Sequence, residues 1–171
     1  MDTNMSATRT NTEIFLRKPV RATDAIHPVK SLTAVVEAVV ATIDDHALSP
    51  LSGRQRLSAL DAKRLLALLS WSYARDLYSS AEIHARLRLA DSAELWDSGL
   101  PDAEGISRFR LENRQALQCC LQAVLHHLAA LKVAEGFVTR INDAHIAAEA
   151  SRRIIRAIFI DQAEVSFSLA A

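Results

Sequence analysis

The sequence predicts an all-α fold, a compact multi-helix domain, and three observations support this prediction. Alanine and leucine, both strong helix formers, supply 29 and 22 of the 171 residues. Apolar residues recur at spacings of three and four along most of the chain, while the alternating β-branched runs typical of strands are few. Only four glycines and four prolines interrupt the pattern, and half of the residues are apolar, which excludes a disordered chain.

The first helix is expected after an N-terminal arm. Residues 1–30 mix polar residues with Pro19 and Pro28, so we expect a flexible arm there and a single helical domain over residues 31–171. Ser31 is expected to cap a helix that ends near Asp44. Its apolar residues recur at helical spacing, and they are Leu32, Val35, Val36, Val39, Val40 and Ile43.

Two further helices are expected after the loop that contains Pro50 and Gly53. The first is predicted from Asp61, as N-cap, to about Tyr78. Its apolar residues surround the helix almost completely, which places it at the buried centre of the domain. The second, shorter helix is predicted from a cap at Ser79 or Ser80 to about Leu89.

A helix-turn-helix-like unit is expected between residues 91 and 112. One helix is predicted to end at Gly99, a residue suited to the left-handed position after a helix, and Asp102 is expected to cap the next. The turn between them, residues 99–101, has the length found in helix-turn-helix units. Long apolar patterns then predict a helix over 113–135 and a C-terminal helix over 140–164.

Charge and motif content exclude several classes of function. The 20 Lys and Arg residues balance 20 Asp and Glu residues, so the chain lacks the strong positive charge that by itself indicates nucleic-acid binding. Histidines and cysteines lack the spacing of metal sites, and no Gly-rich phosphate loop or Gly-x-Ser-x-Gly motif is present. The sequence therefore predicts no metal, no cofactor and no enzymatic activity.

Cysteine placement and hydropathy give an expectation for the compartment. Cys119 and Cys120 are adjacent, and neighbouring side chains on a helix point in different directions, so a disulfide between them is not expected. Residues 1–30 lack the apolar core of a signal peptide, and no continuous apolar run reaches the length of a membrane span. We therefore expect a cytoplasmic protein without membrane association.

Residues 60–125 contain a set of landmarks that points to one family. They are the segment RLLALLSWSYARDLYSS, then Ser79, Ser80 and Ile83, then Trp96, and the string P-D-x-x-x-I-S-R-F-R from Pro101 to Arg110. This part of the chain resembles the N-terminal helical (InsH-type) domain of insertion-sequence transposases. The resemblance implies a DNA-binding module derived from a transposase, and the remaining residues read as helix, with no strands for a catalytic domain.

The predicted helix over 102–112 carries the candidate DNA-binding residues. Ile106 and Phe109 are expected to face the core, which leaves another side of the helix for a DNA groove. On this interpretation the base-edge contacts come from Glu104, Ser107 and Arg108, and the phosphate contacts from Arg110 and Arg114. The alternative interpretation is that these arginines pair with Glu104, Glu112 or a neighbouring helix on a solvated surface.

The C-terminal helix suggests how two copies could associate. Its apolar residues Ile154, Ile155, Ile158 and Phe159 cover a broader arc than one core contact requires, which favours a homodimer interface, the alternative being a buried final helix. Glu149, Arg152, Arg153 and Arg156 are expected to form a salt-bridged exposed face, or a phosphate-contacting one. The sequence thus predicts a homodimer that binds double-stranded DNA, and the competing prediction is a helical protein-interaction or oligomerisation module.

Overall fold

The computed structural model describes residues 32–44, 47–49, 57–90, 96–137 and 140–169. These residues form six α-helices and no strand, so the all-α prediction is confirmed. The helices are α2 (Leu32–Ala41), α3 (Ala59–Ala74), α4 (Ser80–Leu89), α5 (Ala103–Glu112), α6 (Arg114–Ala134) and α7 (Asp143–Leu169). The predicted arm over 1–30 and the predicted cap at Ser31 lie outside the described residues.

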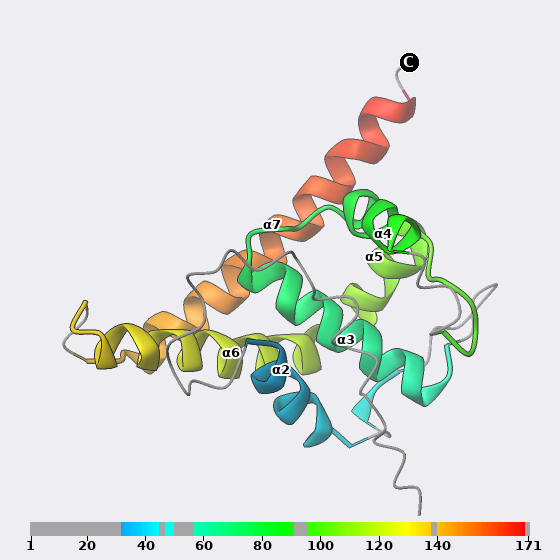
Figure 1. Ribbon diagram of the computed structural model, residues 1–171. Helices are drawn as coiled ribbons and strands as arrows, with labels where there is room; N and C mark the ends of the chain where they lie inside the picture. Colours follow the sequence, from blue (N-terminus) through cyan, green and yellow to red (C-terminus); the bar gives the residue numbers. More distant parts are fainter. Residues whose placement is uncertain (1–31, 45–46, 50–56, 91–95, 138–139, 170–171) are drawn as a thin grey trace, which may run out of the picture.

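Helix α3 lies at the centre of the fold, between α2, α6 and the α4 and α5 pair (Figure 1). Leu65, Leu66 and Leu69 have no exposed surface, as expected for a helix that is apolar on nearly all sides. Helices α6 and α7 pack against each other, and α7 continues past α4 and α5, so that its C-terminal turns project from the rest of the molecule (Figure 1). The core therefore holds the first half of α7 and leaves its end uncovered.

Helix α3 begins and ends earlier than predicted. Its N-cap is Ser58, whose hydroxyl accepts a hydrogen bond from the Asp61 backbone N–H at 3.1 Å, so the prediction of Asp61 as the cap was wrong. The helix ends at Ala74 because Asp76 takes a left-handed conformation, with φ of 61°, which interrupts the helical backbone before Tyr78.

The caps of α4 and α5 agree with the sequence, but the predicted end of the helix between them does not. Ser79 caps α4, and Asp102 caps α5 by accepting a hydrogen bond from the Gly105 N–H at 2.7 Å. Gly99 adopts a left-handed φ of 82°, yet residues 96–99 form a turn and not the last turn of a helix. The predicted three-residue turn between two helices is therefore wrong, and residues 91–95 lie outside the described residues.

Asn113 separates α5 from α6 and fixes the segment before α3. Its side-chain oxygen accepts a hydrogen bond from the Ser49 N–H at 2.7 Å, while its amide nitrogen donates to the Ser49 carbonyl at 3.2 Å. The buried amide thereby satisfies both backbone groups of Ser49, as a neighbouring β-strand would.

Helix α6 combines length with low charge. Among the described residues it is the one helix of at least 18 residues with the composition of a membrane span, a test that core helices of soluble proteins also pass. Its residues Leu117, Leu121 and Val124 are fully buried against the neighbouring helices. The expectation of no membrane association stays a prediction.

Candidate functional site

The exposed side of α5 carries most of the residues predicted to contact DNA. Ile106 and Phe109 are fully buried, as predicted, and fix the orientation of the helix. Glu104 is exposed and Arg108 partly exposed, and the two side chains form an ion pair one helical turn apart. Ser107 is half-buried and Arg114 is exposed at the start of α6. The carboxylate of Glu104 thus offsets the positive charge that Arg108 would offer to a phosphate.

Arg110 lies inside the protein, and its predicted role in contacting phosphate was wrong. The side chain is completely buried, and its guanidinium donates hydrogen bonds to the Asp161 carboxylate at 2.8 Å and to the Ser80 hydroxyl at 2.7 Å. A third contact joins it to the Tyr78 carbonyl at 3.3 Å, and the guanidinium lies 5.4 Å from the centre of the Tyr73 ring. A group enclosed in this way cannot reach a phosphate in solvent.

Asp161 is the partner that brings Arg110 into the core. Its carboxylate also accepts hydrogen bonds from the Ser80 N–H at 2.9 Å and the Ser80 hydroxyl at 2.6 Å. The buried cluster of Tyr73, Ser80, Arg110 and Asp161 therefore connects α3, α4, α5 and α7. Desolvation raises the pKa of the Tyr73 phenol well above its usual value, so this group stays neutral.

The basic residues of α7 are engaged within the protein. Arg152 and Arg153 each contact Glu149 at 2.8 Å, so the predicted ion pairs are present, but Arg153 and Glu149 are half-buried and not part of an exposed face. Arg153 also donates to the Tyr73 carbonyl at 2.6 Å, and the Arg156 guanidinium lies 5.0 Å from the Tyr78 ring centre. These contacts fix the first half of α7 against the end of α3.

The apolar residues predicted as a dimer interface are divided between the core and the solvent. Ile154 has no exposed surface and packs inside the monomer, so its assignment to a subunit interface was wrong. Ile158 is partly buried against the core. Ile155 and Phe159 are exposed, with 65% of the Phe159 surface open to solvent. Val165, one to two turns further on, is 60% exposed and was not identified from the sequence.

Sequence comparisons do not identify the protein. No family model, no curated protein sequence and no solved structure matches the chain. The resemblance of residues 60–125 to a transposase domain therefore stays a prediction.

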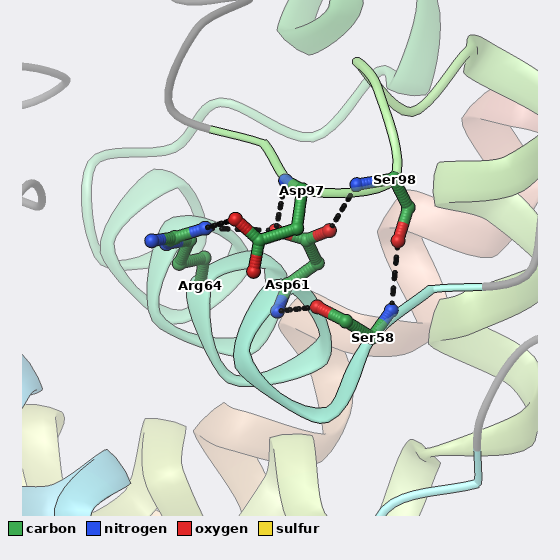
Figure 2. A network of polar contacts seen from close by, with 5 residues as sticks. All are labelled: Ser58, Asp61, Arg64, Asp97 and Ser98. Carbon is green, nitrogen blue, oxygen red and sulfur yellow. Dashed lines mark hydrogen bonds and ion pairs between the residues drawn. The ribbon is translucent and has the colours of Figure 1, made fainter.

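A second buried acid, Asp61, holds the turn at residues 96–99, where the predicted helix was expected to end. Figure 2 shows its carboxylate between α3 and residues 97–98, where it accepts hydrogen bonds from the Asp97 and Ser98 N–H groups at 3.2 and 2.8 Å. Arg64 donates to the same carboxylate at 2.9 Å. Burial alone would raise the pKa of Asp61, but the bonds from Ser98, Arg64 and Asp97 outweigh it and hold the pKa below its usual value.

The residues considered for catalysis and metal binding are dispersed. Among the described residues no group of three or more histidine, cysteine or acidic side chains could hold a metal ion. Cys119 is exposed, whereas Cys120 is buried, and desolvation raises the pKa of its thiol to about 12. A thiol with so high a pKa is not a nucleophile at neutral pH.

A cleft of about 840 Å³ lies between the C-terminal half of α6 and the first half of α7. Leu125, Leu128 and Ile146 line its apolar part. Charged residues also line it, among them Arg153, Lys132 and Arg140. No sequence pattern indicated this cleft, because its walls come from segments that only the packing of the helices brings together.

Proposed function

We propose that this chain is a helical protein-interaction module in which two copies pair through the exposed side of α7. The observation that carries the proposal is the row of apolar side chains on the part of α7 that no other described helix covers. Ile155 and Phe159 begin this row and Val165 continues it. Contiguous apolar surface on a projecting helix is typical of a protein-protein contact.

The spacing of the row favours a second helix as the partner. Ile155, Ile158, Gln162 and Val165 follow one another at intervals of three, four and three residues. These intervals are those of the a and d positions of a coiled coil, which pack against the same positions of another helix. Phe159 lies beside this seam and adds apolar area to it.

Gln162 favours a second copy of the same chain over an unrelated helix. It is exposed and occupies the polar position of the seam. A carboxamide both donates and accepts hydrogen bonds, so it is complementary to an identical carboxamide across a two-fold axis. The formal net charge of the chain is zero at pH 7, so two copies do not repel each other over long distances.

The buried cluster prepares α7 for this contact. Asp161 lies one turn before Val165 in α7, and its bonds to Arg110 and Ser80 hold the helix against α4 and α5. The exposed side chains are therefore presented from a helix of fixed direction. Such preorganisation lowers the entropic cost of association.

The proposal is tested by measuring the oligomeric state of the full chain over a range of concentrations by sedimentation equilibrium. The wild-type chain is expected to dimerise. The double variant Phe159→Ser, Val165→Ser should dimerise at least about a hundredfold more weakly, since each buried apolar side chain contributes roughly 1.5–3 kcal/mol. The matched control is Leu89→Ser, which alters a still more exposed apolar residue on α4 and should leave the association unchanged.

Cross-linking tests the geometry of the pair. In a Cys119→Ser background, Gln162→Cys is expected to form an intermolecular disulfide rapidly, because parallel helices bring this position close to its copy. Glu164→Cys is the control, since Glu164 lies on the other side of α7. A wild-type chain that stays monomeric at millimolar concentration, or equal effects of the test and control variants, would refute the proposal.

DNA binding through residues 102–112 is a second prediction, favoured by the exposure of Arg114 and the partial exposure of Ser107 and Arg108. It is tested by a titration at low salt with the end sequences of neighbouring mobile elements. Salt-dependent binding that Arg108→Ala and Arg114→Ala weaken would support it. If the protein dimerises but does not bind DNA at low salt, the DNA-binding prediction is refuted and the protein-interaction proposal stands.

A further inference from the structure

The cleft between α6 and α7 has the size and composition of a small-molecule site. Its volume of about 840 Å³ falls within the range of ligand pockets in proteins. Leu125 and Leu128 of α6 and Ile146 of α7 are among its apolar lining residues. Charged residues line the rest of the cleft, so a ligand with both an apolar body and a charged group would fit its chemistry.

Several of the charges that line the cleft are already matched. Arg153 contacts Glu149 at 2.8 Å and Asp76 at 3.4 Å, and it also donates to a backbone carbonyl. Glu149 further pairs with Arg152, and Asp76 accepts a hydrogen bond from the Tyr78 hydroxyl at 2.7 Å. These paired groups have little capacity left for a ligand charge.

The remaining charges of the cleft leave an excess of positive charge. Lys132 and Arg140 are both exposed, and neither forms an ion pair with a carboxylate of the described part of the chain. Glu135 is the one unpaired acid that lines the cleft among those residues. Two cations against one anion favour a negatively charged group.

We propose that this cleft binds a soluble amphipathic anion of the medium-chain carboxylate class. The apolar body would lie on Leu125, Leu128 and Ile146, and the carboxylate would lie near Lys132 and Arg140. Burial of the alkyl chain supplies most of the affinity, and the two cations select an acid over an uncharged molecule of the same length. This site is separate from the dimer seam, so it does not depend on the pairing of α7.

The test compares decanoate with decan-1-ol, which share the alkyl chain and differ in charge. Binding to the full chain is measured by isothermal titration calorimetry and by NMR shift changes of the backbone amides. Decanoate is expected to bind and to shift the amides of α6 and α7 that line the cleft. The double variant Lys132→Gln, Arg140→Gln should weaken decanoate binding about five- to tenfold, as expected for the loss of two partly exposed charge contacts, and leave decan-1-ol binding unchanged.

Two controls make the result decisive. Arg88→Gln, Arg114→Gln removes two exposed arginines away from the cleft and should not alter decanoate binding. Ala129→Phe places a large side chain in the cleft and should abolish the binding of both ligands. The proposal is overturned if decanoate does not bind, or if anionic phospholipid vesicles bind while free decanoate does not. It is also overturned if Arg88→Gln, Arg114→Gln weakens decanoate binding or if Ala129→Phe leaves it intact.

Discussion

Replacement of Arg110 by methionine tests whether a buried ion pair holds α7 in place. Methionine keeps much of the length of the side chain and removes its charge. In the native protein Arg110 is fully buried and donates to Asp161, Ser80 and the Tyr78 carbonyl. The variant therefore leaves the Asp161 carboxylate in the core without its cation.

The size of the effect follows from the contacts that remain. Breaking a buried ion pair by removal of one partner costs about 3–5 kcal/mol in the free energy of unfolding. Asp161 keeps two hydrogen bonds from Ser80, at 2.9 and 2.6 Å, so the cost should lie near the lower bound, about 3 kcal/mol. Asp161→Asn should cost a similar amount because it leaves the guanidinium without a counter-charge.

The assay is urea unfolding followed by far-UV circular dichroism at one fixed protein concentration, since dimerisation makes stability depend on concentration. Arg108→Met is the matched control. It changes the same residue type on the same helix, but its pair with Glu104 is exposed and should contribute no more than about 0.5 kcal/mol.

A double-mutant cycle decides whether the two charges act together. The variant Arg110→Met, Asp161→Asn removes both charges, so its loss in the free energy of unfolding should be smaller than the sum of the two single losses by at least about 1.5 kcal/mol. Additive losses, or an Arg110→Met effect no larger than that of Arg108→Met, would refute the role assigned to the pair.

Three further predictions concern other parts of the molecule. Asp61 has a lowered pKa in the folded state, so its contribution to stability should be complete above its usual pKa of 3.8 and disappear as the pH falls through the lower folded value. Asp61→Asn should therefore reduce the loss in the free energy of unfolding that acid causes, whereas Asp97→Asn, at an exposed position, should not. Native protein should react with one equivalent of a thiol reagent at pH 8, at Cys119, and with two in denaturant, because Cys120 is buried; two equivalents in the native state would contradict its burial. Ser79→Ala should lower the free energy of unfolding by about 1 kcal/mol through loss of the α4 cap, and an unchanged urea midpoint would contradict the cap's contribution.

Helix positions followed from the sequence wherever the signal was local. The hydroxyl of Ser79 and the carboxylate of Asp102 cap α4 and α5 as expected, since a cap depends on a side chain and the backbone a few residues away. The prediction of a helix up to Gly99 failed because a distant residue, Asp61, binds the N–H groups of Asp97 and Ser98. Helical spacing contains no information about such a partner.

In the candidate sites, too, the sequence predicted the helical positions but not which side chains are buried. Arg110 and Arg114 are indistinguishable as basic residues of a predicted helical region, yet the first is buried and the second is exposed. Ile154 and Ile155 are adjacent in sequence, but only Ile155 reaches solvent. Burial depends on where Asp161 and the core face of α7 lie, and the sequence pattern alone did not specify these positions.

The amino-acid order by itself determined that this chain is helical and where most of its helices start, because backbone hydrogen bonds and caps are formed between near neighbours. Tertiary packing alone decided which charges became internal partners, which apolar side chains stayed in solvent along α7, and where α6 and α7 enclose a cleft. These features arise between residues separated by tens of positions in the chain, as with Arg110 and Asp161, and they exist only once the helices are packed together.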